Sequence, residues 1–203
     1  MKFDLHLHTC RYSPDATMTP EELVHQALAI GLDGIVITEH DRLWPESELN
    51  KLRSLAGNLT ILAGVEITGS GGDMLCYGVQ NLDHLQRGVS WDKLVKEVHK
   101  QGGVCVAAHP YRWNQPIESL LLSLPEAIDG LEMMSKNMDH SMRKKAIQLA
   151  NKDSSLAQLG NSDAHETENV GCCYTWFDDP ISSTSELVCA IRNRKCKPME
   201  NLR

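Results

Sequence analysis

Short apolar runs recur along the chain, and each one ends in polar or charged residues. The runs cover residues 3–7, 34–38, 60–65, 74–79, 104–108, 130–134 and 157–160. Runs of four to six apolar residues without strict alternation are typical of strands that are covered on both faces, as in parallel sheets. We therefore expect these seven segments to be strands of one buried sheet.

Amphipathic segments with helix signals lie between several of these runs. Residues 19–22 (Thr-Pro-Glu-Glu) form a capping box with proline at the first helical position, and Gly31 can end that helix. Ser90, Asp139 and Ser183 can cap three further helices. The alternation of strands with helices predicts an α/β fold with a parallel sheet, either open or closed into a barrel.

Composition and charge narrow the class of protein. The 203 residues carry a net charge of −7 and are 41% hydrophobic, and they show no internal repeat, so we expect one globular domain over residues 1–203. The acidic balance argues against binding long nucleic acid, because no basic stripe is present to displace counterions. No apolar run approaches the ~20 residues of a membrane-spanning helix, and the N-terminus has no apolar signal core. We therefore expect a cytoplasmic protein that does not bind membranes, whose seven cysteines are reduced packing residues.

Ionisable residues gather where the predicted strands end. Five of the nine histidines have this placement: His6, His8, His40, His109 and His165. Three acidic residues share it: Glu66, Asp163 and Glu132. Because the carboxyl ends of parallel strands meet at one edge of a sheet, we expect these side chains to converge. Two residues apart on a strand, His6 and His8 point to the same face and can bind one ion.

Such a cluster predicts a metal site. Crowded carboxylates and imidazoles repel like charges and lose hydration when they are buried, and divalent cations remove both costs. Imidazole and carboxylate ligands without a positioned thiolate suit Zn, Mn or Fe. The donors exceed what one tetrahedral ion can use, so we expect two or three ions with a bridging carboxylate.

Five motifs in order carry a family resemblance: HLHTCRYSPDA, ITEHD, GVEIT, AHPYR and GNSDAH. Together they resemble the PHP family, named for its polymerase-associated and histidinol phosphatase members. The resemblance runs from residue 2 to about residue 175, and the segment 183–197 resembles the closing helix of small stand-alone members. It implies a single-domain, distorted (β/α)7 barrel with a trinuclear metal site at the C-terminal ends of the strands.

The resemblance also implies three sets of metal ligands. The first set is His6, His8, Glu66 and Asp163. In the second set, Glu66 bridges to an ion held by Asp73 and His109. The third set is Asp15, His40 and His165. The position of Asp73 is often histidine in the family, so this chain places an additional negative charge there.

A site of this kind predicts a phosphoesterase in which a metal-activated hydroxide attacks the phosphate. We expect Glu66 to hold the metal ions that bind the nucleophile, and His109 or His165 to protonate the leaving oxygen. Glu39 and Asp41, which flank the histidine of ITEHD, can orient ligand imidazoles by hydrogen bonds, and Asp41 can equally cap the segment that follows.

Residues close to the ligand motifs are candidates for binding the substrate. Arg112 follows the AHP motif and can bind phosphate in a bidentate manner, and Arg11 and Arg42 are second choices. Three aromatic side chains in loops after strands are candidates either for stacking on a base or for plain packing: Trp44, Tyr111 and Trp113.

The favoured substrate is a small phosphomonoester or a nucleotide. Alternatives are an exonuclease acting on short oligonucleotides and a non-catalytic metal-binding accessory module. Hydrolysis of C–N bonds, as in amidohydrolase-type barrels, commonly relies on a carbamylated lysine at a strand end, and no lysine has that position here.

Overall fold

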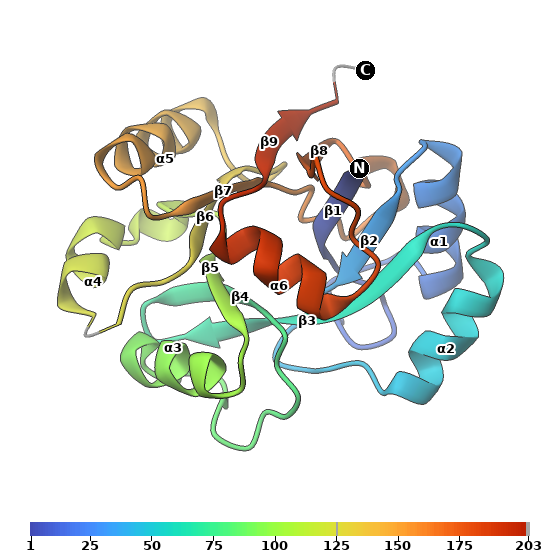
Figure 1. The fold of residues 1–203 in the computed structure, drawn as a ribbon, viewed down its shortest axis with the longest axis horizontal. Coiled ribbons are helices and arrows are strands. Elements are labelled where there is room, and N and C mark those ends of the chain that lie inside the picture. Colours follow the sequence, from blue (N-terminus) through green and yellow to red (C-terminus); the bar gives the residue numbers. More distant parts are fainter. Residues whose placement is uncertain (125, 202–203) are drawn as a thin grey trace.

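The computed structural model describes residues 1–124 and 126–201 (Figure 1). In chain order the elements are β1 (Lys2–Leu7), α1 (Pro20–Ala29), β2 (Gly34–Ile37), α2 (Glu46–Leu55), β3 (Thr60–Gly69), β4 (Gly72–Tyr77), α3 (Trp91–Lys100), β5 (Val104–Ala107), η1 (Arg112–Asn114), α4 (Ile117–Ser123), β6 (Gly130–Met134), α5 (His140–Lys152), β7 (Ala157–Gly160), η2 (Thr167–Asn169), β8 (Cys173–Trp176), α6 (Thr184–Arg192) and β9 (Lys197–Glu200). Within the described residues, no helix has the length and apolarity needed to cross a membrane.

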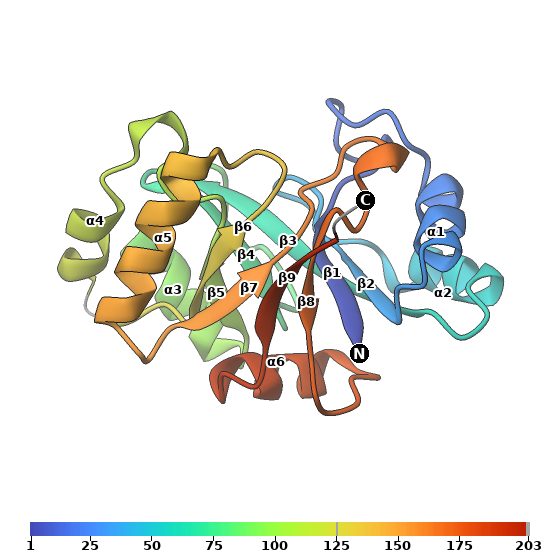
Figure 2. The ribbon, with the colours of Figure 1, turned by 90° about the horizontal axis from the view of Figure 1, so that it is seen from above.

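The strands form one sheet with the order β7-β6-β5-β4-β3-β2-β1-β8-β9. Figures 1 and 2 show the sheet curled so that β9 lies beside β7, which leaves a nearly closed barrel with most helices on its outside. The predicted α/β barrel is therefore confirmed.

The expectation of a parallel sheet is wrong for β4. β4 runs antiparallel to both β3 and β5, and β8 is antiparallel to both β1 and β9. Two residues, 70 and 71, join β3 to β4, whereas a parallel crossover needs about a dozen or more. This hairpin, which has no helix, distorts the strand–helix alternation of the barrel.

All seven predicted strands are present as β1 to β7, and the four predicted helices are α1, α3, α5 and α6. The capping boxes at Thr19 and Ser183 form, and Asp139 caps α5, but the side chain of Ser90 makes no capping hydrogen bond. The sequence patterns gave no prediction for α2, α4, β8 or β9. Pro45 precedes α2 and gives it no side-chain cap, which explains why no helix signal marked it.

Apolar side chains fill the barrel at the end where β1 begins. Phe3 and Leu5 pack there with Tyr77 and with Leu187 and Ile191 of α6, all of them buried. α6 lies across this end of the barrel (Figure 2). Two other apolar clusters lie between the sheet and the outer helices. The barrel is thus closed at one end by hydrophobic packing, and its polar groups lie toward the other.

A break in the alternation of β1 positions the site. Phe3 and Leu5 belong to the interior cluster, but Leu7 packs with residues of α1 outside the barrel. The pairing register of β1 with β2 shifts between Asp4 and Leu7. Such an irregularity re-aims the side chains that follow it, and here His6 lies with buried carboxylates instead of beneath α1.

A partly buried ionic contact joins α3 to the loop before β6. His99 Nε2 lies 2.8 Å from Asp129 Oδ2, and the same carboxylate oxygen accepts a 2.8 Å hydrogen bond from the Cys105 backbone N–H. The hydrogen bond to Asp129 raises the pKa of His99 above its ordinary value of 6.5, against the effect of burial.

This contact predicts a pH-dependent contribution to stability. Because the folded-state pKa of His99 is raised, the contribution is fully present below about pH 6.5 and is lost as the pH rises through the higher folded-state pKa. We expect His99→Gln to lower the free energy of unfolding more at pH 6 than at pH 9, measured by urea denaturation. His25→Gln, at an exposed position of α1, is the matched control. An equal loss for His99→Gln at both pH values would contradict the prediction.

Candidate metal centre

The strand ends bring the predicted ligands together. His6 lies on β1 and His8 directly after it, His40 follows β2, Glu66 lies within β3, His109 follows β5, and Asp163 and His165 follow β7. Asp73 lies at the start of β4 and pairs with Thr68 of β3. Because β4 is antiparallel, its start lies at the same end of the barrel as the carboxyl ends of its neighbours.

The carboxylate of Glu66 lies at the middle of the cluster and is wholly buried. Its Oε1 is 3.3 Å from His6 Nε2 and 3.1 Å from His109 Nε2. Its Oε2 is 3.3 Å from His8 Nε2 and 2.9 Å from His40 Nδ1. Burial opposes ionisation, but the charge of His6 and the hydrogen bonds from His109 and His40 hold the pKa of Glu66 well below its usual range. Glu66 is therefore a carboxylate in position to bridge ions.

Asp163, which follows β7, faces His6 and His8 from across the cluster. Its Oδ1 lies 3.2 Å from His6 Nε2 and 3.5 Å from His8 Nε2, and its Oδ2 accepts a 2.6 Å hydrogen bond from Asn137 Nδ2. Its backbone φ of +52° is in the left-handed region, which side chains with a Cβ rarely adopt. Such strain is concentrated at functional sites, where the surrounding structure maintains it.

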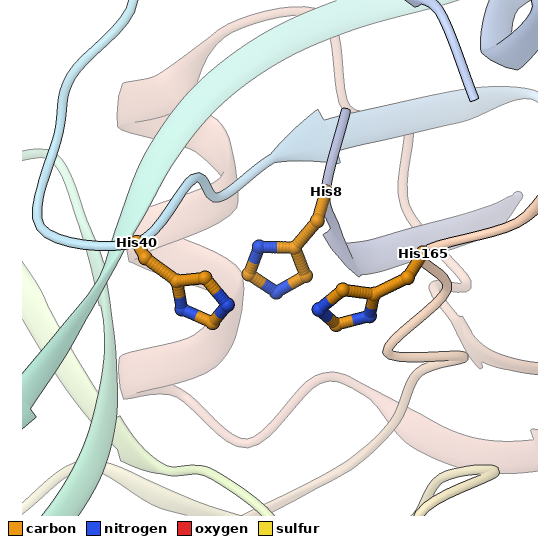
Figure 3. Close-up of side chains that lie close together, drawn as sticks. All are labelled: His8, His40 and His165. Carbon is orange, nitrogen blue, oxygen red and sulfur yellow. The ribbon is translucent and has the colours of Figure 1, made fainter. Parts of the chain in front are cut away.

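Three imidazoles, those of His8, His40 and His165, face one another at the open side of the cluster (Figure 3). The ring centroid of His8 is 4.2 Å from that of His40 and 4.3 Å from that of His165. Asp15 Oδ2 lies 3.2 Å from His40 Nε2 and 3.4 Å from His165 Nε2. The family resemblance placed His8 only in the first ligand set, whereas the structure places it between that set and the third.

Asp73 joins Glu66 and His109 on the other side of the cluster. Its Oδ2 lies 4.0 Å from His109 Nε2, and one ligand atom from each of the three residues lies within 4.8 Å of the others. Burial and the charge of Glu66 raise the pKa of Asp73. The structure therefore places Asp73 with the residues that the family resemblance assigned to the same ion.

The residues fit a group of divalent cations. His6 Nε2 and His8 Nε2 are buried and have no hydrogen-bond partner, an uncommon state for buried polar atoms. Cations would take up these lone pairs and offset the buried negative charge. The donors fall into overlapping groups that share His6, His8, Glu66 or His109, as a multinuclear site requires. Metal binding by each residue, the number of ions and their identity stay predictions.

The same carboxylates control protonation of the histidines. Burial alone lowers the pKa of His6, but the charges of Asp163 and Glu66 raise it well above its usual value. Against the same effect of burial, Glu66 raises the pKa of His40 to about 9. Protons and metal cations therefore compete for one set of negative charges, and metal binding must release protons.

Glu132 lies behind the cluster and orients two of its members. Its Oε1 is 3.0 Å from His6 Nδ1 and accepts a 2.9 Å hydrogen bond from Asn161 Nδ2, and its Oε2 accepts a 2.8 Å hydrogen bond from the His109 backbone N–H. Both carboxylate oxygens of Glu132 therefore help to hold His6 and His109 in place. The sequence correctly put Glu132 at this edge, and the structure gives it a supporting position.

The expected contacts of Glu39 and Asp41 with ligand imidazoles are wrong. Glu39 accepts a hydrogen bond from Ser13 Oγ, and Ser13 Oγ lies 3.2 Å from His8 Nδ1, so its influence on the histidine is indirect. Asp41 Oδ2 accepts a 3.0 Å hydrogen bond from Arg87. Glu39 and Asp41 are adjacent to His40 in sequence, but their side chains point away from it and contact the residues packed on the other side of the chain.

Sequence reasoning missed Asp4 as a supporting residue. Its buried carboxylate accepts hydrogen bonds of 3.0 Å from the Ser162 N–H and 2.9 Å from the Gly171 N–H, which tie the segment carrying Asp163 to β1. Burial raises the pKa of Asp4 to about 6. The sequence does carry a signal for this supporting role, because Asp4 is an acidic residue inside the apolar run FDLHL.

A cavity of about 410 Å³ opens over the cluster. Among the described residues that line it, the arginines are Arg87 and Arg112. Arg112 Nη1 lies 3.7 Å from Asp163 Oδ2, so the guanidinium lies next to the ligand layer. A larger cavity of about 970 Å³ lies between α2 and α6, and its lining includes none of the clustered histidines.

Arg11 and Arg42 do not line the cavity over the cluster. Arg11 donates a 3.0 Å hydrogen bond to Glu48, and the guanidinium of Arg42 lies over the ring of Tyr12 at 4.1 Å from its centroid. The expectation that these two side chains bind substrate phosphate therefore finds no support in their positions. Arg87, which no motif marked, occupies the rim instead.

Comparison with known proteins identifies the family. The model of the PHP domain matches residues 4–161, and that of the PHP-associated region matches residues 141–196. The chain belongs to the PHP domain family. It is 29% identical over 121 residues to the uncharacterized protein MJ1587 of Methanocaldococcus jannaschii, a match that covers 55% of this chain and 68% of that protein.

Solved structures with the same fold are more distant in sequence. A two-domain protein from Bacteroides vulgatus containing a predicted PHP-like metal-dependent phosphoesterase has a TM-score of 0.70 at 21% identity, over 98% of this chain and 64% of that one. An amidohydrolase from Chromobacterium violaceum, solved with sulfate and no metal, has a TM-score of 0.71 at 18% identity, over 98% of both chains. The lesion-specific endonuclease EndoQ of Pyrococcus furiosus has a TM-score of 0.71 at 19% identity, and 57% of its chain is covered.

The position of Glu132 predicts an effect on metal affinity. Glu132→Gln replaces the carboxylate that faces His6 Nδ1, and loss of such a supporting group typically weakens metal binding about 10- to 100-fold. We expect this loss in a competition titration of chelator-stripped protein against a chromophoric chelator. Glu48→Gln, which alters a carboxylate bound to Arg11 outside the cavity, is the control. Unchanged metal affinity in folded Glu132→Gln would show that the carboxylate does not support the ligands.

Proposed function

We propose that this protein is a metal-dependent phosphoesterase that hydrolyses a small phosphomonoester, such as a nucleotide. The observation that carries the proposal is the position of Glu66 among four imidazoles, directly beneath a cavity whose rim carries Arg112. Membership of the PHP domain family supports it. A small partner suits a cavity of about 410 Å³ and an overall charge of −7.

The clustered side chains suit the hydrolysis of a phosphomonoester in three ways. Divalent ions held by the cluster would supply Lewis acidity and a water of lowered pKa. Glu66 and Asp163 hold their positions through the histidines and Asn137, so the negative charge that binds cations is preorganised. Arg112 can bind the phosphate oxygens beside that layer, since guanidinium and phosphate match in a bidentate geometry.

His109 and His165 are the two candidates for delivering a proton to the leaving oxygen, and both line the cavity. Both nitrogens of His165 have neighbours, because Nδ1 lies 3.1 Å from the Asp163 carbonyl oxygen and Nε2 lies 3.4 Å from Asp15 Oδ2. His109 lines the cavity and keeps Nδ1 without a hydrogen-bond partner. That nitrogen is buried, so the contacts do not favour His109 over His165 as the proton donor.

A substrate panel tests the proposed function. Protein purified without chelator and supplied with Mn, Zn or Fe(II) should hydrolyse p-nitrophenyl phosphate or nucleoside monophosphates faster than bis(p-nitrophenyl) phosphate or a short RNA. Glu66→Gln should lower kcat at least about a hundredfold, because a ligand shared by two ions contributes more than a supporting group. Faster release of 5′-nucleotides from the RNA would favour the exonuclease. No turnover of any substrate, with metal bound, would favour a non-catalytic module.

Arg112 provides a second test. We expect Arg112→Ala to leave the metal content unchanged and to lower kcat/KM about ten- to a hundredfold, equivalent to about 1.4–2.7 kcal/mol. Arg11→Ala is the matched control, because Arg11 pairs with Glu48 outside the cavity. Equal kinetics for the two variants would remove Arg112 from the phosphate site.

A further inference from the structure

Only one of the three aromatic side chains in loops after the strands is exposed at the site. Trp44 is 7% exposed and donates a hydrogen bond to Glu39, and Tyr111 is 9% exposed and donates one to Glu118. Both are packing residues. Trp113 is 68% exposed and lines the cavity over the metal cluster.

The indole of Trp113 is held beside the reacting groups. The guanidinium of Arg112 lies over its ring, 4.3 Å from the centroid, and the ring of His109 meets it edge-on with centroids 6.0 Å apart. A guanidinium occupies one face of an indole, so at 68% exposure the ring keeps a large apolar area open to a ligand. An exposed tryptophan on a cavity rim is typical of a binding surface.

The backbone around Trp113 is strained, and packing of the indole does not offset the strain. Four residues of this loop have positive φ: His109 (+26°), Tyr111 (+72°), Trp113 (+53°) and Asn114 (+58°). Each such residue without glycine's freedom costs free energy. Because Trp113 buries little of its own surface, the cost is not recovered by placing the indole in the core, which points to a role in binding.

We infer that Trp113 is the specificity-determining residue of the site, a stacking surface for a planar aromatic ring attached to the substrate's phosphate. This inference rests on the proposed phosphoesterase function. With Arg112 binding the phosphate and its guanidinium against the indole, a ring joined to the phosphate by a short linker reaches Trp113. A nucleoside monophosphate has this form. Stacking tolerates any base, since every base has a π-face.

Paired substrates test the inference. AMP and ribose 5-phosphate share the phosphate and the sugar but differ in the base. We expect Trp113→Ala to lower kcat/KM about tenfold or more for AMP and less than about twofold for ribose 5-phosphate, while Trp113→Phe retains most of the AMP activity. An equal loss on both substrates would mean that Trp113 merely positions Arg112, and no loss on either would mean that it binds nothing; both results overturn the inference.

A binding measurement separates failure of the inference from failure of the proposed function. AMP should quench the tryptophan fluorescence of the metal-loaded protein, and ribose 5-phosphate should not. The quenching should disappear in Trp113→Phe and persist in Trp176→Phe, which changes a partly buried tryptophan of β8. If AMP binds in this way but is not hydrolysed, the phosphoesterase proposal fails and the stacking surface stands. If AMP is hydrolysed but the quenching is unaffected in Trp113→Phe, the stacking surface is ruled out and the phosphoesterase proposal stands.

Discussion

The structure depends on the balance of charge around Glu66. A buried carboxylate is tolerated only when opposite charges or hydrogen bonds compensate it, and here four histidines from the ends of β1, β2 and β5 lie within 3.3 Å of its oxygens. Their positions depend in turn on a second layer, in which Glu132 orients His6 and the backbone of His109. Removal of one group leaves others buried and unpaired, so the cluster acts as a unit.

The two ends of the barrel have complementary physical roles. At one end α6 and the interior side chains of β1 and β4 exclude water, and at the other the ionisable groups face a cavity. Apolar packing beneath a polar cluster lowers the local dielectric, which strengthens each charge–charge interaction above it. A rigid sheet also holds the donor atoms at fixed separations, which exposed loops alone would not do.

Much of this site could be predicted from the sequence because polar residues that interrupt apolar runs mark strand ends. That rule found Glu66 and the five histidines, but Asp15 and Asp73 came only from the family resemblance, since one lies in a loop and the other begins an antiparallel strand. The pattern of apolar runs did not predict that β4 is antiparallel, because this direction follows from the short turn between β3 and β4. Proximity in sequence misled in the case of Arg11, which is near the ligands along the chain but binds an acidic side chain of α2. Side-chain direction in loops depends on tertiary packing.

The place of β1 in the sheet has a consequence for synthesis of the protein. β1 lies between β2 and β8, and the Leu5 N–H donates a hydrogen bond to Asn161 Oδ1, 156 residues further along the chain. Chains fold from the N-terminus as they leave the ribosome, so β1 to β3 can pair early, while the other side of β1 waits until β8 has been made. Closure over such a separation is entropically costly and slow. His6 and His8 therefore emerge long before Asp163, so the predicted metal site is complete only after the segment that follows β7 has been made.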